Sequence, residues 1–580
     1  MNDEVADRFE EMADLLAAKG VDYKPRAYRR AAENIREFPR PIDERAIQGP
    51  DAVEVIDGVG EALAEKVVEY VETGEIAELE ALRDELPVEM DALTRVEGVG
   101  PKTVGDLYEA LGIRTLDDLE RAAREGEIRE VKGFGEKTEA NILDNVDFAR
   151  QATERQRIGE ARPLADEVLD LLDGVGPVQR AEVAGSLRRW RETIGDVDVL
   201  AASDDAGAVV DAFTDWERAD ETIEAGTIKA SVRADGVRVD LRVVTPAEFG
   251  SALQYFTGSK DHNVRLRNYA IDRDMKLNEY GAFDVSELDG KGDDQRAGER
   301  VAGETETGMY GALDLPWIPP ELREDTGEIA AAEAGDLPDL VAVDDVRGDL
   351  HTHTIWSDGT TSIEPMVEAA AERGYDYHCV TDHATGPGMV GGVGLTDEEL
   401  RDQIDAVREV AAEAPIDVFA GVEANVDAEG RISVADDVLA DLDIVVASPH
   451  SALDQPEDAA TERLVAAVEH PEVDVLGHPS GRKINRRSGL DFDATVVAEA
   501  AAAAGTALEV NANPARLDLR DDAVRTAVEA GAPVAVNTDA HSPAEFDLIR
   551  YGVHTARRGW AEAADVVNTR DADGLRDFLG

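Results

Sequence analysis

This 580-residue chain contains a single cysteine, Cys379, and no long apolar run. One cysteine excludes an internal disulfide framework and suits a reducing cytoplasm, so we expect Cys379 to be a small buried strand residue. A membrane-spanning helix would need about 20 consecutive apolar residues, which the sequence does not offer. Residues 1–5 also lack the basic and then apolar pattern of a secretory signal. We therefore expect a cytoplasmic protein without membrane contact.

Positive charge is scarce, and lysine is the scarcest source of it. The chain has 126 acidic and 59 basic residues, a net charge of −67, and only 11 lysines. Its 43% hydrophobic content and periodic Leu, Val and Ala patterns argue against a disordered acidic chain. The composition resembles that of halophilic archaea, whose salt-rich cytoplasm screens the repulsion between acidic groups. High salt also weakens general attraction to DNA, so we expect local contacts through metals, helix N-termini and a few basic side chains.

Residues 1–150 carry short amphipathic helices and a hydrophobic-Gly-hydrophobic-Gly motif that occurs three times, at 56–60, 96–100 and 131–135. Each motif ends one apolar segment and begins another helix. Its glycines permit positive φ, and the N–H groups that open the second helix can face a phosphate. One such turn could be an ordinary helix C-cap, but three resemble the helix-hairpin-helix DNA-binding motif. The glycines concerned are Gly58, Gly60, Gly98, Gly100, Gly133 and Gly135.

The apolar segments after residue 150 predict further regions that differ in their order of helices and strands. A helix is expected at 160–173 and strands at 180–184, 198–201, 230–233 and 237–244, which predicts a mixed α/β unit. Residues 246–320 are expected to be helical and then irregular, and 321–346 to form a linker helix or loop. From residue 347 onward, short strands alternate with Ala/Glu-rich helices, which predicts a β/α barrel.

Three aspartates in the α/β unit suit a site for two metal ions. Asp196 and Asp198 flank Val197, so in a strand both carboxylates lie on one face. Asp240 lies in an apolar strand, where an unpaired carboxylate would be costly. Three carboxylates on one face can bind two Mg²⁺ ions that hold the attacking and leaving oxygens in line. An isolated Asp-x-Asp would more simply be a solvated strand edge.

A Gly-Ser turn ten residues before these aspartates favours the metal site over the solvated edge. Gly185 and Ser186 would place backbone N–H and hydroxyl groups against a triphosphate. Arg189 would neutralise its charge.

This arrangement resembles the nucleotidyltransferase palm, and more closely that of the family X DNA polymerases, which include DNA polymerase beta. A second block, Tyr-Phe-Thr-Gly-Ser at 255–259, strengthens the resemblance and is followed by Asn263, Arg267 and Leu-Asn-Glu-Tyr at 277–280. The resemblance implies that Tyr255, Phe256 and Gly258 contact the sugar and the primer terminus. It also implies that Asn263 meets the incoming base, and that Arg267 and Arg238 contact DNA.

The N-terminal region resembles the lyase domain of the same family. The run 23–30 resembles its 5′-phosphate pocket, which implies DNA contacts by Lys24 and Tyr28. Lys66 stands where the family keeps a lysine whose amine attacks an abasic sugar and allows β-elimination. A solvated helix lysine stays open as the alternative. Tyr23 and Ala62 stand where a histidine and a phosphate-binding lysine are common, so lyase activity is less strongly implied than polymerisation.

Histidines and carboxylates gather in the last third of the chain, and six of the chain's ten histidines belong to short motifs that follow the expected strands there. Such barrels place their chemistry at these strand ends. Imidazole and carboxylate are ligands of Zn, Mn and Fe. Nine ligands imply two or three ions, and such clusters hydrolyse phosphate esters. The nine residues are His351, His353, Asp358, His383, Glu423, His450, His478, Asp539 and His541.

This ligand pattern resembles the polymerase-and-histidinol-phosphatase (PHP) domain, and all nine positions carry metal-capable residues. The resemblance implies a cluster of Mn²⁺ or Zn²⁺, a 3′→5′ exonuclease and an abasic-site endonuclease. We expect residues 509–516, which include Glu509 and Asn511, to support the ligands. The combination with the palm identifies the chain as a bacterial or archaeal type of family X polymerase with a C-terminal PHP domain.

The expected fold is multidomain, with a helical N-terminal region, an α/β nucleotidyltransferase palm with a small thumb, and a C-terminal PHP barrel. The expected boundaries are 1–85 for a lyase-like domain with the first hairpin, 86–152 for a fingers-like helix-hairpin-helix domain, 153–245 for the palm, 246–320 for the thumb, 321–346 for a linker and 347–580 for the barrel.

The expected function is DNA-directed synthesis that fills short gaps in base excision repair, with degradation of DNA ends by the PHP site. The expected substrates are deoxynucleoside triphosphates and gapped or primed DNA with a 5′-phosphate, bound by a monomer. Two alternatives stay open: a phosphatase that uses the PHP site alone, and a non-catalytic DNA-binding scaffold with structural metals. The first gives the palm and hairpins no purpose, and an intact ligand set argues against the second.

Overall fold

The structure is a computed structural model that describes residues 2–21, 23–36, 42–56, 58–96, 98–288, 295–386 and 393–580. Two residues of the hairpin motifs, Asp57 and Glu97, lie outside these ranges. The chain forms two compact units, Met1–Arg155 and Gln156–Gly580. Among the described helices, none combines the length and apolar character that a membrane crossing requires.

The first unit is entirely helical within its described residues. Its helices are α1 (Asn2–Ala18), α2 (Lys24–Arg36), α3 (Ile42–Ala46), α4 (Pro50–Val53), α5 (Glu61–Thr73), α6 (Ala77–Glu85), α7 (Met90–Thr94), α8 (Pro101–Leu111), α9 (Leu116–Arg124), the 3₁₀ turn η1 (Ile128–Glu130) and α10 (Glu136–Glu154). A continuous apolar core runs through these helices.

The three hairpin motifs have the same backbone geometry. The first glycine of each, at positions 58, 98 and 133, has φ of 74°, 80° and 102°. The second glycine, at positions 60, 100 and 135, is the extended N-cap of α5, α8 and α10. No side chain caps these helix N-termini among the described residues. The first-turn N–H groups of these helices are therefore available to an anion.

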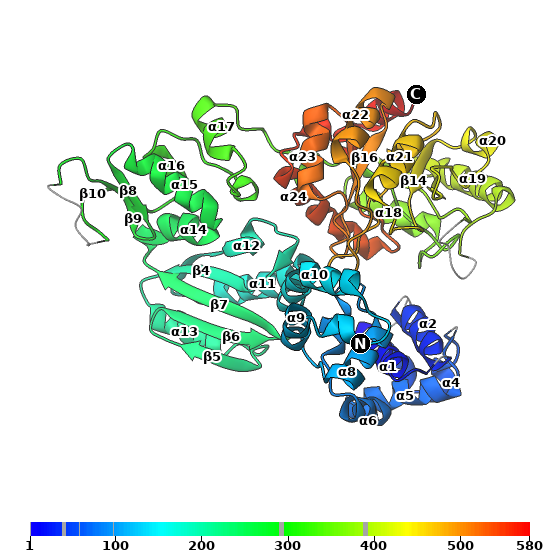
Figure 1. Ribbon diagram of the computed structural model, residues 1–580. Helices are drawn as coiled ribbons and strands as arrows, with labels where there is room; N and C mark the ends of the chain where they lie inside the picture. Colours follow the sequence, from blue (N-terminus) through cyan, green and yellow to red (C-terminus); the bar gives the residue numbers. More distant parts are fainter. Residues whose placement is uncertain are drawn as a thin grey trace. The chain divides into compact units, whose positions relative to one another are not determined.

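The second unit begins with a five-stranded sheet of order β2-β4-β7-β6-β5. Its strands are β2 (Val178–Val183), β4 (Val197–Ser203), β5 (Glu221–Ala225), β6 (Lys229–Ala234) and β7 (Val237–Val244), beside a two-stranded pair, β1 (Gln156–Arg157) and β3 (Thr193–Ile194). Helices α11 (Ile158–Asp173) and α13 (Ala206–Thr214) pack on this sheet (Figure 1). The sequence did not predict β5, because all five of its residues are exposed and give no apolar alternation.

Residues 246–334 form a smaller α/β segment. Its elements are η2 (Pro246–Glu248), α14 (Phe249–Thr257), α15 (Lys260–Ile271), β8 (Met275–Asn278), β9 (Gly281–Asp284), β10 (Glu299–Ala302), α16 (Glu306–Gly311), η3 (Pro320–Leu322) and α17 (Glu328–Ala334). Strands β8, β9 and β10 form an antiparallel sheet. The prediction of irregular structure after the helices was wrong here, because strands of four residues are too short to show a reliable period.

The expected linker at 321–346 contains helix α17 and the turn η4 (Val343–Asp345). The start of this segment is packed against the rest of the unit. Glu321, Leu322, Arg323 and Glu328 are each at most 4% exposed. Burial therefore holds the first part of the segment in place.

The C-terminal region is a nearly closed barrel of seven parallel strands in sequence order: β11 (Gly348–Asp349), β12 (Tyr377–Val380), β13 (Asp417–Asn425), β14 (Ile444–Ser448), β15 (Val475–Leu476), β16 (Ala507–Asn511) and β17 (Val534–Asn537). A parallel bridge from Thr352 to Ala540 joins the two ends. Cys379 is fully buried in β12, as expected.

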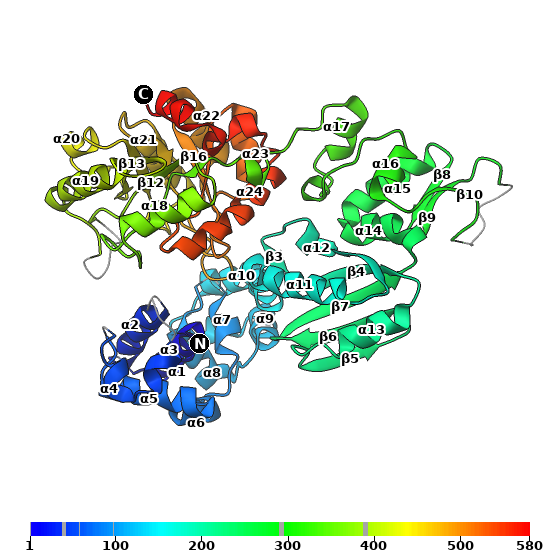
Figure 2. The same ribbon diagram turned by 180° about the vertical axis from the view of Figure 1, so that it is seen from behind.

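Helices cover the outside of the barrel (Figure 2). They are α18 (Ile363–Glu372), α19 (Asp397–Ala411), α20 (Asp436–Leu439), α21 (Glu457–Val468), α22 (Ala494–Ala504), α23 (Asp521–Ala530), α24 (Ile549–Arg558) and α25 (Ala572–Leu579).

Candidate functional site

The three palm aspartates lie together on one face of the five-stranded sheet, at its inner strands β4 and β7. Asp198 and Asp240 are register partners on the neighbouring parallel strands β4 and β7. Asp196 directly precedes β4, and one carboxylate oxygen from each residue lies within 4.8 Å of the others. Val197 and Val199 point to the opposite face, into the core that α11 and α13 cover. Strand alternation thus separates the acidic face from the apolar one.

The environment of these carboxylates favours a cation. Burial, together with repulsion from Asp196 and Asp240, raises the pKa of Asp198 to about 7. Asp240 accepts a hydrogen bond from the Ser231 hydroxyl and one from Arg238 Nε at 3.0 Å. Arg238 is half exposed, so it compensates only part of the clustered negative charge. Divalent ions bound by oxygen ligands would relieve the repulsion, so the residues present fit Mg²⁺.

The Gly-Ser turn lies directly against Asp198. Gly185 opens the short helix α12 (Gly185–Arg188) with φ of 62°. A Cβ at this position would collide with the Asp198 carboxylate. Only glycine permits this approach, so the turn that offers Ser186 lies beside the face that carries the three aspartates.

Arg189 contacts residues 255–259, which end helix α14 and lead into α15. Arg189 donates through Nη1 to the Thr257 carbonyl and through Nε to Glu324 at 3.0 Å. Burial lowers the pKa of Arg189, and Glu324 opposes that shift. Gly258 has φ of 73° and lies beside the Arg189 guanidinium.

Asn263 is fixed by its neighbours on α14. Its Nδ2 donates to the Tyr255 carbonyl at 2.7 Å, and its Oδ1 accepts from Gln254 at 2.8 Å. The Tyr255 and Phe256 rings meet edge to face at 5.1 Å. Arg267 Nε donates to the Asn263 carbonyl at 3.2 Å. The second block of predicted residues therefore lies together on consecutive helices.

The nine residues predicted at the C-terminus converge at the carboxyl ends of the barrel strands. They form four overlapping groups whose ligand atoms lie within 4.8 Å of one another. The groups are His353, Asp358, His383 and His541; His351, Glu423 and His478; His351, His353 and Asp539; and His383, Glu423 and His450. Glu423, His351 and His353 each belong to two of these groups, so the arrangement suits more than one ion.

Several buried atoms of this cluster have no hydrogen-bond partner in the part of the chain that the structure describes. They are His351 Nε2, both ring nitrogens of His353, His383 Nδ1 and both carboxylate oxygens of Glu423. An unpaired buried polar atom costs about 1–3 kcal/mol. Imidazole and carboxylate that converge in this way fit a transition-metal cluster.

Other residues orient the histidines. Glu509, on β16, contacts His351 Nδ1 at 2.7 Å and His478 Nδ1 at 3.2 Å through its two oxygens. Asn425 contacts His450 Nδ1 at 2.7 Å, so the Nε2 atoms of these rings face the cluster. The sequence had indicated Glu509 but not Asn425. Asn425 follows Glu423 by two residues in β13, and this shared strand face was a signal that could have found it.

The cluster also attracts positive charge. Burial lowers the pKa of His383, but Glu423 and Asp358 outweigh it and raise the pKa to about 10. Burial likewise lowers the pKa of His541, but Asp358 and Asp539 outweigh it and raise the pKa to about 9. Imidazoles that are protonated beside carboxylates would exchange their protons for metal ions.

In the first unit, Lys66 and Lys24 share one carboxylate. Lys66 Nζ lies 3.0 Å from Glu78 and Lys24 Nζ lies 3.5 Å from it. The Tyr28 ring packs edge to face on Phe9 at 5.5 Å, and burial, with a smaller effect of Glu78, raises the pKa of Tyr28 above its ordinary value. No sequence pattern distinguishes Glu78 from the other acidic residues on α6. The structure thus brings Lys24, Tyr28 and Lys66 together around an acidic group.

Comparisons with known proteins agree with these features. Residues 1–76 match the helix-hairpin-helix domain family and residues 90–146 match the SAM-like helix-hairpin-helix tandem family. Residues 252–324 match the DNA polymerase beta thumb family, and residues 349–512 match the PHP domain family.

Three relatives show how much of the chain the similarity covers. The chain is 35% identical over 575 residues to the DNA polymerase/3'-5' exonuclease PolX of Bacillus subtilis (strain 168), which covers 98% of each chain. It is 26% identical over 341 residues to DNA polymerase lambda of Rattus norvegicus, covering 55% of this chain and 56% of that protein. DNA polymerase lambda of Arabidopsis thaliana is 25% identical over 348 residues, covering 56% and 62%.

The fold and the two carboxylate-rich clusters define a polymerase joined to a metal-dependent phosphoesterase barrel. The match to the Bacillus subtilis protein extends over 98% of both chains and therefore identifies the family within this class. The chain belongs to the family X DNA polymerases, in the form with helix-hairpin-helix segments, a thumb and a C-terminal PHP domain.

Proposed function

We propose that this chain is a DNA-directed DNA polymerase that fills short gaps during base excision repair and removes nucleotides from 3′ ends with its PHP domain. The observation that carries the proposal is the presence of two separate ligand sets in one chain. One is the in-register palm aspartates, and the other is the nine-residue barrel cluster. The substrates are deoxynucleoside triphosphates and gapped or primed DNA that carries a 5′-phosphate.

In the polymerase site, Asp196, Asp198 and Asp240 would hold two Mg²⁺ ions. Divalent ions bound at either cluster supply the in-line alignment and charge neutralisation that phosphoryl transfer and hydrolysis need. Gly185, Ser186 and Arg189 bind the triphosphate. Asp240 takes the proton of the primer 3′-hydroxyl, and its hydrogen bonds from Ser231 and Arg238 hold the carboxylate in place.

The remaining palm and thumb residues position the substrates. We propose that Tyr255, Phe256 and Gly258 border the sugar and the primer terminus. Asn263, which Gln254 and the Tyr255 carbonyl fix, faces the edge of the incoming base. Arg238 and Arg267 contact DNA.

In the PHP site, the nine residues would hold two or three ions of Mn²⁺ or Zn²⁺, with Glu509 and Asn425 orienting the histidines. The clustered carboxylates of this site repel the negatively charged phosphodiester of DNA unless cations neutralise them. Hydrolysis at this site therefore requires bound metal ions. We propose that this site is a 3′→5′ exonuclease that also cleaves at abasic sites.

In the N-terminal unit, the three pairs of hairpin glycines would hold DNA phosphates through backbone N–H groups. Lys24 and Tyr28 line the 5′-phosphate pocket, and Lys66 is the candidate lyase nucleophile. We also propose domain boundaries at 85, 152, 245, 320 and 346. The acidic composition supports a monomer from the salt-rich cytoplasm of a halophilic archaeon.

A phosphatase that acts on small phosphomonoesters, or a DNA-binding scaffold, explains less. The first does not explain why Asp198 and Asp240 lie opposite each other on neighbouring strands. The second leaves several buried ligand atoms of the barrel without a hydrogen-bond partner among the described residues. Neither is supported by a specific observation.

The test is primer extension on gapped DNA with Mg²⁺, combined with 3′-end degradation with Mn²⁺. We expect Asp198→Ala to abolish extension and to retain degradation, and His353→Ala to do the reverse. If Asp198→Ala extends the primer like the wild type, the polymerase assignment is wrong. If His353→Ala degrades the 3′ end at the wild-type rate, the nuclease assignment is wrong.

A further inference from the structure

The side chain of Arg189, which we place at the triphosphate, is held partly by a residue from outside the palm. Its Nε donates to Glu324 Oε1 at 3.0 Å. Glu324 is the last residue of the segment that matches the polymerase thumb. Both side chains are largely buried, at 14% and 19% exposed, so water competes little for this contact.

Glu324 is in turn shared with the PHP barrel. Arg558, the last residue of α24, donates through Nη1 to the same Glu324 oxygen at 3.1 Å and to the backbone carbonyl of Arg189 at 2.7 Å. One guanidinium of the barrel therefore contacts both Arg189 and the carboxylate that orients it. Arg558 is only 5% exposed.

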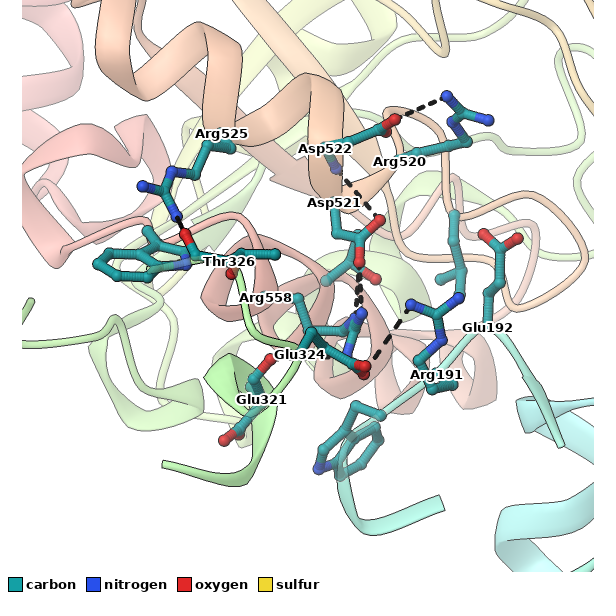
Figure 3. Close-up of a pocket in the computed structure, with 14 residues that line it drawn as sticks. Arg191, Glu192, Glu321, Glu324, Thr326, Arg520, Asp521, Asp522, Arg525 and Arg558 are labelled. Carbon is teal, nitrogen blue, oxygen red and sulfur yellow. Dashed lines mark hydrogen bonds and ion pairs between the residues drawn. The ribbon is translucent and has the colours of Figure 1, made fainter. Parts of the chain in front are cut away.

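Arg558 is itself fixed by Asp521 in the first turn of α23. Its Nε and Nη2 contact one Asp521 oxygen at 2.9 and 2.5 Å. Figure 3 shows Asp521, Arg558 and Glu324 pointing toward one another from α23, α24 and the end of the segment that matches the thumb. These side chains border a cavity of about 500 Å³, and Arg191 reaches Glu324 from its rim at 3.9 Å.

The residue after Arg189 is anchored to the same helix. The Trp190 ring stacks on His554 of α24 with centroids 3.6 Å apart, and the Arg162 guanidinium lies 5.0 Å from the Trp190 ring. Trp190 has φ of 54°, a conformation that a bulky residue keeps only when its surroundings impose it. Contacts with α24 therefore fix the backbone on the carboxyl side of Arg189 as well as its side chain.

We infer that Arg558 and Asp521 of the PHP barrel, acting through Glu324, are positioning residues that hold Arg189 where the polymerase binds the triphosphate. The inference rests on the proposed nucleotide-binding role of Arg189. It makes the barrel a structural part of the synthesising site in addition to its own nuclease site. Without Arg558, the cationic partners that Glu324 keeps among the described residues are Arg189 and Arg191, and the Arg189 carbonyl loses a donor.

The test measures steady-state primer extension by the full chain on gapped DNA, with the incoming deoxynucleoside triphosphate varied. We expect Arg558→Ala to raise KM for the nucleotide about tenfold, the effect of losing one charge-assisted hydrogen bond. Arg558→Lys should restore part of this loss, because an ammonium can pair with Glu324 and Asp521. The rate of 3′-end degradation with Mn²⁺ should stay at the wild-type value in both variants.

Two further variants keep the test decisive. Asp521→Asn keeps the shape of its side chain and removes the charge that fixes Arg558, so it should raise KM for the nucleotide with a smaller effect than Arg558→Ala. Glu192→Gln is the matched control. It breaks a different ion pair between the palm and the barrel, the one to Arg482 at 2.8 Å, and should leave KM for the nucleotide unchanged.

The outcomes separate the inference from the proposed function. If the wild type does not extend primers, the proposed function fails. If the wild type extends primers and a folded Asp521→Asn or Arg558→Ala variant keeps the wild-type KM for the nucleotide, only the inference is overturned. An equal rise of KM in Glu192→Gln would also overturn it, because the effect would then reflect a general loosening of the palm against the barrel.

Discussion

The Asp198 carboxylate lies so close to the backbone of Gly185 that no side-chain carbon can be placed between them. This contact joins the turn that offers Ser186 to the strand that carries the palm aspartates. The positions of the turn and of the strand face that carries the aspartates are therefore coupled, and a change in either displaces the other.

Replacement of Gly185 by alanine tests this contact. The new Cβ would collide with Asp198 and would sit at φ of 62°, where alanine is disfavoured. We expect Gly185→Ala to reduce primer extension at least about a hundredfold, since a misplacement of about 1 Å at a catalytic site costs that much. Degradation of 3′ ends should be retained. Gly236→Ala is the control, because φ there is also positive but a Cβ would meet nothing within 4 Å.

Glu306 gives the polymerase segment a pH dependence of stability. It is buried and accepts hydrogen bonds from Arg188 at 2.8 Å and Arg323 at 2.6 Å. Burial raises the pKa of Glu306, but Arg323 and Arg188 outweigh it and lower the pKa to about 2. Because the folded pKa lies below the ordinary value of 4.5, the stabilisation is complete above about pH 4.5 and is lost as the pH falls through 2.

Glu306→Gln should therefore lower the free energy of unfolding by about 3–5 kcal/mol at pH 7, the usual effect of removing one partner of a buried ion pair. The difference from the wild type should shrink at pH 3. Denaturant unfolding at both pH values measures it, with the exposed Glu304→Gln as control. A difference that is the same at pH 7 and pH 3 would contradict the argument.

Glu509 offers a test of metal binding that spares the ligands themselves. Its two oxygens orient His351 and His478. Loss of such a support typically costs 10–100-fold in metal affinity. We expect Glu509→Gln to shift the Mn²⁺ concentration for half-maximal exonuclease activity upward by about that factor, with activity recovered at high Mn²⁺. His353→Ala should not recover, and primer extension should be normal in both variants.

Glu78 makes a prediction about the lyase site. Its carboxylate pairs with Lys66 Nζ at 3.0 Å, so the aldehyde of an abasic sugar must compete with this ion pair for access to the amine. We expect Glu78→Gln to increase borohydride trapping of an abasic 5′ end several-fold. Trapping should disappear in the double variant with Lys66→Ala. Unchanged trapping in Glu78→Gln would show that the pair has no influence on the lysine.

The sequence predicted what depends on local pattern. The nine barrel residues could be found because each belongs to a short motif at a strand end. The palm aspartates could be found because strand alternation determines which face they share. It could not predict β5, which is exposed throughout, or the four-residue strands β8 to β10. Nor could it predict contacts between distant segments, such as Glu78 with Lys66 or Glu324 with Arg558, because no periodicity relates these positions.

The proposed metal ligands of the barrel lie between residues 351 and 541, so the order of synthesis would determine when its chemistry can begin. A chain that stops before β17 lacks Asp539 and His541 and holds an incomplete ligand set. The anchor of the palm turn, Arg558, comes later still. A growing or truncated chain would therefore carry all three palm aspartates without a complete nuclease site, and nuclease action would await the last strand.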